Sequence, residues 1–195
     1  APAVTVARPQ ILQTARMTAV GIAPPERHGA GSLVPALLIA AGRTGLQVML
    51  ALRQALREQF GTLDALPHLR FLFLDTDPET TARATQGPDG LPARDVLLTR
   101  LNRPAHYLQR DGLPSVEQWL PPGLLYRLPR SPGPAEGVRA FGRLALADHY
   151  RVVAQRLRQE IETFLSDAPL DRAAERTGLG VRSNRARAYV LAGLA

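Results

Sequence analysis

The fold is decided by residues 37–77, which read LLIAAGRTGLQVMLALRQALREQFGTLDALPHLRFLFLDTD. Their start belongs to a short, almost wholly apolar run over residues 33–41, which is typical of a strand buried on both faces of a parallel sheet. Residues 44–60 are predicted to form a helix, because apolar side chains recur there at helical spacing. A second buried strand is expected over residues 70–74. The sequence therefore predicts a β-α-β unit with a right-handed crossover.

Outward from this unit the predicted elements are sparser. Residues 138–164 are expected to form one long amphipathic helix that packs on the sheet, and residues 188–191 a third strand. Residues 82–135 are interpreted as a proline-rich, irregular insertion with weak helical patterns, pinned by a small core of its own. Residues 1–32 are interpreted as an N-terminal extension or linker. The expected class is α/β, with a Rossmann-like parallel-sheet domain over residues 33–195.

Composition excludes several classes of function. The chain has no cysteine, and its four histidines lack the spacing of metal ligands, so no disulfide or Cys/His metal site is expected. It has no lysine either, which excludes P-loop chemistry. The net charge of +7 comes from arginines spread among acidic residues, a pattern that disfavours nucleic-acid binding. No apolar run approaches the ~20 residues of a membrane span and no secretion signal is evident, so a cytoplasmic protein is expected.

The turns that follow the strands form the candidate site, because ligands of open α/β sheets bind beyond the carboxyl ends of the strands. The glycine turn at residues 42–45 opens a helix, so its main-chain N–H groups and the helix dipole could bind a phosphate without lysine; a plain tight turn is the alternative. Asp75 stands where such folds bind a ribose, whereas Asp77 is equally suited to cap the helix that starts at Pro78. Gly193 follows the third expected strand.

A further glycine-rich segment, SPGPAEGVRAFGR, occupies residues 131–143 before the long helix. Its glycines either bring main-chain N–H groups to another phosphate oxygen or relax the junction between loop and helix. The candidate phosphate- and sugar-binding residues are therefore Gly42, Arg43, Thr44, Gly45, Asp75, Thr76, Asp77, Gly133, Gly137, Gly142, Arg143 and Gly193. No catalytic residue and no metal ligand is assigned.

Taken in chain order, these turns resemble those of the tubulin/FtsZ superfamily, and most closely bacterial tubulin-like proteins outside cell division. The family's G-x-G-G-T-G turn is matched by AAGRTG at residues 40–45, and its N-T-D or D-T-D turn by residues 75–77. The family's G-A-G loop, followed by G-R before a helix, is similar to residues 133–143. The next strand in the family runs into the tubulin signature A-G-x-G-G-G-T-G-x-G, whose start resembles AGLA at residues 192–195.

The resemblance implies a protein that binds GTP or GDP, with Mg²⁺ accompanying the nucleotide. It implies that the first and third glycine loops surround the phosphates, that residues 75–77 lie near the sugar or the metal-phosphate region, and that Gly193 begins the loop for the α- and β-phosphates. Head-to-tail self-association into filaments follows from the same analogy. The sequence reads as the front half of such a protein, incomplete at its C-terminus. GTPase activity is expected only if a C-terminal part and a neighbouring subunit complete the site.

Departures from the family pattern keep two alternatives open. Arg43 stands where the family usually has glycine, so either the main chain approaches a phosphate less closely or the guanidinium itself contacts it. Ala40 also replaces a glycine, and the G-A-G loop reads G-P-A with one extra spacer residue. These changes are compatible with a degenerate, non-catalytic scaffold. The other alternative is an NAD(P)-binding Rossmann protein, although 33 residues separate Gly42 from Asp75, against about 20 in that fingerprint.

Overall fold

A four-stranded parallel sheet forms the centre of the fold, with its strands in the order β4-β3-β2-β6. The structure is a computed structural model that describes residues 31–108, 119–128, 130, 133–135, 137–181 and 185–193. Residues 1–30 of the expected N-terminal extension and the last two residues of the AGLA segment lie outside the described part. The elements are β1 (Ser32–Leu33), β2 (Ala36–Ala41), α2 (Gly42–Phe60), η1 (Leu63–Ala65), β3 (Leu69–Asp75), α3 (Pro78–Ala84), η2 (Ala93–Asp95), β4 (Val96–Leu98), α4 (Pro104–Leu108), α5 (Pro122–Leu125), α6 (Arg139–Asp148), α7 (Tyr150–Leu165), α8 (Asp167–Thr177), β5 (Gly180–Val181) and β6 (Arg187–Ala192).

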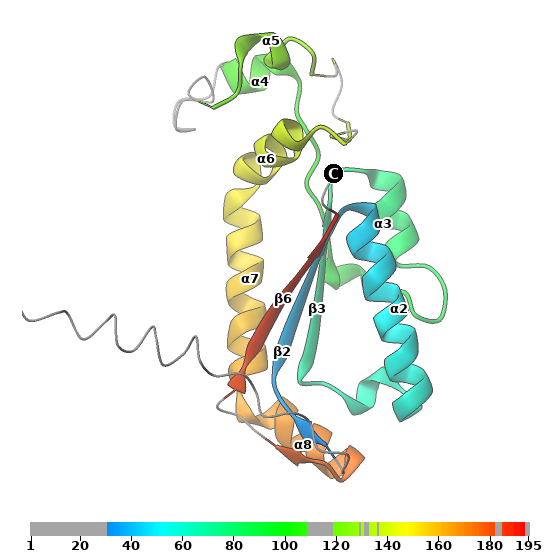
Figure 1. The fold of residues 1–195 in the computed structure, drawn as a ribbon. Coiled ribbons are helices and arrows are strands. Elements are labelled where there is room, and N and C mark those ends of the chain that lie inside the picture. Colours follow the sequence, from blue (N-terminus) through cyan, green and yellow to red (C-terminus); the bar gives the residue numbers. More distant parts are fainter. Residues whose placement is uncertain are drawn as a thin grey trace, which may run out of the picture. The chain divides into compact units, whose positions relative to one another are not determined.

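Helices cover both faces of this sheet (Figure 1). α2 and α3 pack on one face, and α7 packs on the other against β2 and β3. Apolar side chains such as Leu38, Met49 and Phe73 fill the space between α2 and the strands. The connection from β2 through α2 to parallel β3 confirms the predicted β-α-β unit, and the α/β parallel-sheet class is confirmed with it.

The register of the sheet brings the carboxyl ends of its strands to one level. Ala41 at the end of β2 pairs with Leu74 of β3 on one side and with Ala192 of β6 on the other. Asp75, the last residue of β3, pairs with Leu98 of β4. The segments that follow these four strands therefore start side by side at one edge of the sheet.

Two strand predictions differ from the structure. The strand expected over residues 33–41 is divided at Pro35, which has no N–H to donate to a ladder. The part before the proline is β1, which pairs with β5 in a separate two-stranded parallel sheet. The weak helical pattern around residues 96–101 is misleading, since Val96–Leu98 form strand β4 beside β3. A run of three apolar residues carries too little periodicity to distinguish a helix from a strand.

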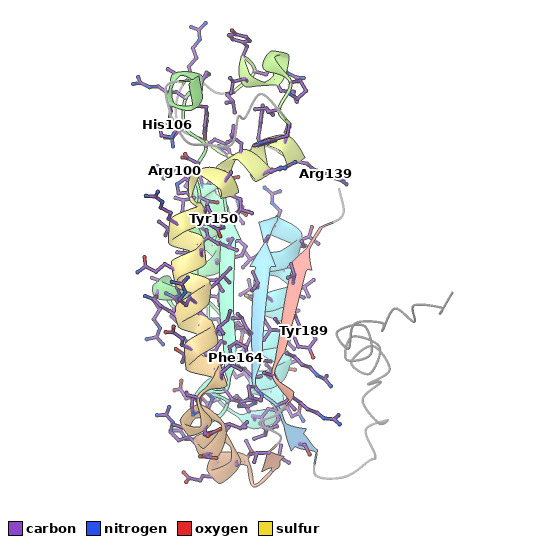
Figure 2. The ribbon with its side chains drawn as sticks, turned by 90° about the vertical axis from the view of Figure 1, so that its left-hand side faces the viewer. Arg100, His106, Arg139, Tyr150, Phe164 and Tyr189 are labelled. Atoms are coloured by element: carbon purple, nitrogen blue, oxygen red, sulfur yellow. The ribbon has the colours of Figure 1, made fainter. Side chains whose placement is uncertain are left out.

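The long helix expected over residues 138–164 is divided into α6 and α7 at His149, whose ψ of 10° departs from helical geometry. In Figure 2, α7 runs along the sheet with Tyr150 at its start and Phe164 near its end. The apolar residues that predicted the helix divide in two: Val153 and Phe164 are buried, whereas Leu146, Tyr150 and Ile161 are exposed. α8, which follows in a mostly polar stretch, was not predicted.

A chain of ion pairs fixes α7 to its face of the sheet. Glu160 of α7, only 3% exposed, accepts a hydrogen bond from Nε of Arg70 on β3 at 2.6 Å. It also lies 2.6 Å from Nη2 of Arg156, one turn earlier on the same helix. Arg156 in turn reaches Oδ1 of Asp95 in η2 at 2.7 Å. These contacts connect α7, β3 and the segment that leads into β4.

Described residues of the segment 82–135 form a small apolar cluster together with residues of α6. Leu101, Tyr107, Leu120, Leu125 and Leu128 are buried together with residues of α6, and Trp119 packs against them. Tyr126, by contrast, is 76% exposed. This satellite cluster holds α4 and α5 against α6.

Candidate functional site

The start of α2 is a helix N-terminus without a side-chain cap. Its N-cap position is Ala41, whose side chain cannot accept a hydrogen bond, and the first turn contains no acidic residue. Gly42 has a φ of +71°, a left-handed conformation that favours glycine, and it turns the chain sharply from β2 into the helix. The first N–H groups of a helix have no intrahelical acceptor, so an anion placed here would meet free donors and the positive end of the dipole.

Close packing of the main chain brings the end of β6 to this turn. A side-chain Cβ at Gly45 would lie 2.3 Å from the carbonyl oxygen of Leu191, so glycine is required for α2 to pack against β6. At Gly193 an added Cβ would lie 3.1 Å from Oγ1 of Thr44. The structure thus places the glycine turn at the start of α2 beside the segment that follows β6.

The turn after β3 is organised by its two carboxylates. Asp77 caps α3, since its side chain accepts hydrogen bonds from the N–H of Glu79 at 3.0 Å and of Thr80 at 3.3 Å, and from Oγ1 of Thr80 at 2.6 Å. The capping alternative is therefore confirmed for this residue. Oδ1 of Asp75 accepts a hydrogen bond from the N–H of Asp77 at 3.0 Å, which closes the turn. The carbonyl oxygen of Asp75 accepts from the N–H of Thr99 at 2.8 Å, just beyond β4.

Electrostatics connect Arg43 with these two carboxylates. Burial raises the pKa of Asp75 above its ordinary value, against the opposing effects of main-chain hydrogen bonds and of the charge of Arg43. The hydrogen bond from the Thr80 hydroxyl lowers the pKa of Asp77, and the charge of Arg43 adds to this effect. The guanidinium of Arg43 therefore acts on the turn after β3 although it belongs to the turn after β2.

The glycine-rich segment before α6 meets the same edge at its beginning. The N–H of Ala135 donates to Oγ1 of Thr76 at 2.9 Å, so the Asp-Thr-Asp turn directly contacts this loop. Gly133 is held by a pair of main-chain hydrogen bonds to Leu101, at 3.0 and 3.2 Å. Gly137, with a φ of +78°, directly precedes Val138, the N-cap of α6, which makes no side-chain capping bond. The first half of the segment therefore contacts the turn after β3 through Ala135.

The second half of that segment is arranged differently. Gly142 lies inside α6, where an added Cβ would meet nothing within 4 Å. The guanidinium carbon of Arg143 lies 4.4 Å from the centre of the Trp119 ring, a cation–π contact with the satellite cluster. Thr99, whose N–H donates to the carbonyl oxygen of Asp75, belongs to no motif and was not predicted from the sequence, whereas the contact of Ala135 with Thr76 comes from within the glycine-rich segment.

The comparison with protein families matches residues 37–195 to a family described as "Tubulin like". The chain belongs to this tubulin-like family. Neither the comparison with curated proteins nor that with solved structures gave a match. The Rossmann-like parallel sheet of this tubulin-like chain agrees with the resemblance drawn from its turns.

Two further properties of the tubulin-like chain concern its described residues alone. None of the helices there is long and apolar enough to cross a membrane. Within the same residues, no three or more histidine, aspartate or glutamate side chains come together as a metal-binding group.

Proposed function

We propose that this tubulin-like chain binds a guanine nucleotide at the carboxyl edge of its sheet. The observation that carries the proposal is the uncapped N-terminus of α2, which opens directly from β2 and is flanked by the end of β6. Free N–H groups at a helix start bind phosphate oxygens, and the helix dipole favours their negative charge. The residues present thus fit a phosphate: Gly42 through Gly45 contact it from one side and Gly193 from the other.

The turn after β3 is proposed to bind the sugar or the Mg²⁺–phosphate region. Asp77 already accepts hydrogen bonds from α3, which leaves Asp75 and the Thr76 turn as the part nearest to the ligand. Ala135, which lies between Gly133 and Gly137 in the third loop, donates its N–H to Oγ1 of Thr76, and these two glycines are proposed to complete the phosphate site. Gly142 is proposed to act only through the conformation of α6, and Arg143 through Trp119, since its guanidinium faces that ring.

Calorimetric titration of the full chain with GTP, GDP, ATP and NAD tests the proposal. The informative variant is Thr44→Asp, because a carboxylate in the first turn of α2 favours the helix while repelling a phosphate. We expect it to lower GTP affinity by about tenfold or more. Ala51→Asp, which adds the same charge to an exposed position further along α2, is the matched control and should bind nearly as well as the wild type. Saturable binding of NAD and not of GTP would replace this proposal with the dinucleotide alternative.

Arg43→Gly separates a functional site from a degenerate scaffold. If Arg43 serves the site, its removal leaves Asp75 and Asp77 uncompensated and weakens GTP binding. If Arg43 instead marks a lost site, restoring the family's glycine should strengthen binding or create it. Absence of heat in titrations of both the wild type and Arg43→Gly would support the scaffold.

We also propose that the chain self-associates head to tail, as its family membership suggests. Pelleting and electron microscopy of the full chain with and without GTP test this step. Filaments that require GTP are the expected result. Equal sedimentation in both conditions would contradict nucleotide-driven assembly without bearing on nucleotide binding itself.

A further inference from the structure

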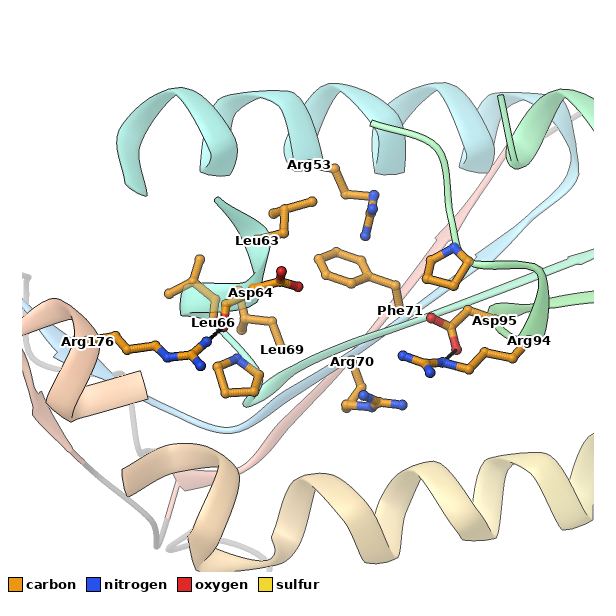
Figure 3. A pocket seen from close by; sticks show the side chains of 12 residues that line it. Arg53, Leu63, Asp64, Leu66, Leu69, Arg70, Phe71, Arg94, Asp95 and Arg176 are labelled. Carbon is orange, nitrogen blue, oxygen red and sulfur yellow. Dashed lines mark hydrogen bonds and ion pairs between the residues drawn. The ribbon is translucent and has the colours of Figure 1, made fainter. Parts of the chain in front are cut away.

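A groove of about 390 Å³ lies beside the first half of β3, at the opposite end of the strand from Asp75 (Figure 3). The volume is within the range of binding pockets for small ligands. α2, η1, β3, the η2 segment and α8 all contribute to its wall. The groove is separate from the carboxyl edge discussed above, since its lining residues belong to the amino-terminal half of β3 and its surroundings.

The floor of the groove is a free strand edge. β4 is only three residues long and pairs with Phe73–Asp75, so no described strand lies beside residues 69–72 on that side. The carbonyl of Asp75 points toward Thr99, on the β4 side of β3. Main-chain N–H and C=O groups of every second residue in a strand point to the same side, so those of Phe71 also point to the β4 side. Neither the N–H nor the C=O of Phe71 has a hydrogen-bond partner on that edge among the described residues.

The chain before β4 leaves this edge open because it turns away from the sheet. Pro92 cannot donate to a ladder, and the N–H of Asp95 bonds back to the carbonyl oxygen of Pro92 at 2.8 Å. The 3₁₀ turn η2 thus holds the segment at the wall of the groove. An incoming strand would take the position that a longer β4 would occupy.

Arginines outnumber carboxylates among the residues that line the groove. Arg53, Arg70, Arg94 and Arg176 come from four different elements, against two carboxylates, Asp64 and Asp95. In Figure 3 Arg53 points toward Phe71 from α2, while Arg70 points toward α7 on the other side of the strand. Arg94 and Arg176 retain N–H groups that are free to donate to a ligand.

Arg94 and Arg176 are the accessible cations of this groove. The Arg94 side chain is 72% exposed and lies 3.8 Å from Asp95, too far for a strong hydrogen bond. Arg176 is exposed and donates to a main-chain carbonyl, that of Asp64, rather than to a carboxylate. Arg53 already donates to the carbonyls of residues 89 and 90. Arg70 is paired with Glu160 of α7. The groove therefore has positive charge at both of its ends that no described carboxylate neutralises fully.

We propose that this groove binds an extended, acidic peptide segment, which adds to the sheet as a strand beside residues 69–72. Strand addition to an exposed sheet edge is an established mode of peptide recognition, in which main-chain hydrogen bonds supply affinity and flanking pockets supply selectivity. The free N–H and C=O of Phe71 are the main-chain partners, and the half-buried apolar side chain of Leu63 contacts the peptide from η1. Arg94 and Arg176 bind its carboxylates. A nucleic acid strand would satisfy the arginines but offers no alternating donors and acceptors for the strand edge.

The test uses fluorescence anisotropy with a fluorescein-labelled hexapeptide of alternating glutamate and valine, added to the full chain. Arg94→Glu/Arg176→Glu should lower affinity about tenfold or more, because both charge-assisted contacts become repulsive. Arg158→Glu/Arg172→Glu makes the same change of charge at exposed positions of α7 and α8 outside the groove, and should bind like the wild type. The same peptide with N-methylated valines, which cannot pair with a strand edge, should bind at least several-fold more weakly.

Hydrogen exchange of the wild-type chain provides a readout that does not depend on any variant. The main-chain N–H of Phe71 should become protected when the acidic peptide is added and stay unprotected with the N-methylated peptide. The proposal is overturned if the acidic peptide does not bind saturably, or if N-methylation leaves its affinity unchanged. It is equally overturned if a single-stranded oligonucleotide competes for the same arginines at lower concentration than the peptide.

Discussion

The ion-pair chain that holds α7 to the sheet should be broken by Glu160→Gln. The amide keeps the shape of the side chain but removes the negative charge that Arg70 and Arg156 share at 2.6 Å each. The remaining guanidinium groups would then be partly buried beside a neutral group. Because α7 contacts the sheet mainly through this region and the buried face with Val153 and Phe164, the loss should weaken the docking of the whole helix.

The magnitude follows from burial. Removing one partner of a buried ion pair costs about 3–5 kcal/mol, because the other charge is left unpaired in a poorly solvated place. Here the Glu160 side chain is 4% exposed, but those of Arg70 and Arg156 are 22% and 17% exposed and can turn partly toward water. A loss of about 2–3 kcal/mol is therefore expected. For a chain of this size, this corresponds to a lower Tm by about 4–12 °C.

The loss of stability in Glu160→Gln should depend on pH. Burial alone would raise the pKa of Glu160, but hydrogen bonds and charges from Arg70 and Arg156 outweigh it and lower the pKa. A carboxylate with a depressed folded pKa contributes stability above its unfolded value, and that contribution is lost as the pH falls through the folded pKa. The difference between wild type and Glu160→Gln should thus be complete at pH 7 and shrink below about pH 4.

Urea denaturation followed by far-ultraviolet circular dichroism measures this difference. Glu162→Gln is the matched control, since it removes the same charge from an exposed position of the same helix and should change the free energy of unfolding by less than about 0.5 kcal/mol. Equal stability of the two variants at pH 7 would refute the assigned role of Glu160. A difference that persists undiminished at pH 3 would refute the electrostatic origin.

Four further predictions concern single residues. Burial lowers the pKa of His68 to about 4. The unfolded chain therefore binds a proton at this residue that the folded chain does not, and the free energy of unfolding should fall as the pH decreases from about 6.5 to 4. Urea denaturation should show a shallower decline for His68→Gln than for the wild type. Asp77→Ala removes the cap of α3 and should cost about 1 kcal/mol, measured as a lower Tm, whereas Asp77→Ser should lose less. Gly45→Ala should cost about 1–3 kcal/mol, because its Cβ would collide with the carbonyl of Leu191. Gly142→Ala, whose Cβ meets open space inside α6, should instead stabilise by about 0.5–1 kcal/mol in the same thermal denaturation.

Each of these predictions has an outcome that contradicts it. Parallel stability curves for wild type and His68→Gln between pH 6.5 and 4 would show that His68 binds its proton equally in both states. Equal melting temperatures for Asp77→Ala and Asp77→Ser would deny that the hydroxyl or carboxylate oxygen matters to α3. If Gly45→Ala were tolerated as well as Gly142→Ala, then the close approach of α2 to β6 would not depend on glycine.

The central β-α-β unit could be predicted from sequence because each of its elements carries its own signal. The run of apolar residues that became β2, the helical periodicity of α2 and the apolar run of β3 are each set by local burial. β4 gave no usable signal because three apolar residues fit a helix or a strand equally well. These residues form a strand because they pair with Phe73–Asp75 at the edge of β3. α8 was missed because its buried side is narrow: Leu170 and Ala173 are buried among mostly polar neighbours.

The candidate site could be predicted only as separate turns. That the turns meet depends on the strand order and register, which place Ala41, Asp75 and Ala192 at one level and which no local pattern contains. The contact between Thr76 and Ala135 joins residues 59 positions apart, and Ala135 has no side-chain chemistry by which it could be singled out. The contact of the Arg143 guanidinium with the Trp119 ring is likewise a long-range contact that the local sequence does not indicate.

Arg43 gives a physical reason why a departure from the family pattern is compatible with the proposed phosphate site. Two carboxylates at the end of β3 repel any anion that approaches the start of α2, and unit charges 4 Å apart interact by about 1 kcal/mol in water and by about 4 kcal/mol at the effective dielectric constant of a protein surface. Burial raises the pKa of Asp75, and the charge of Arg43 opposes this shift only in part, whereas it adds to the lowering of the Asp77 pKa that the Thr80 hydroxyl causes. A glycine at this position would bring the main chain closer to a phosphate but would leave that repulsion uncompensated. In the proposed site the positive charge of Arg43 would therefore offset part of that repulsion, in place of the closer main-chain approach that glycine allows.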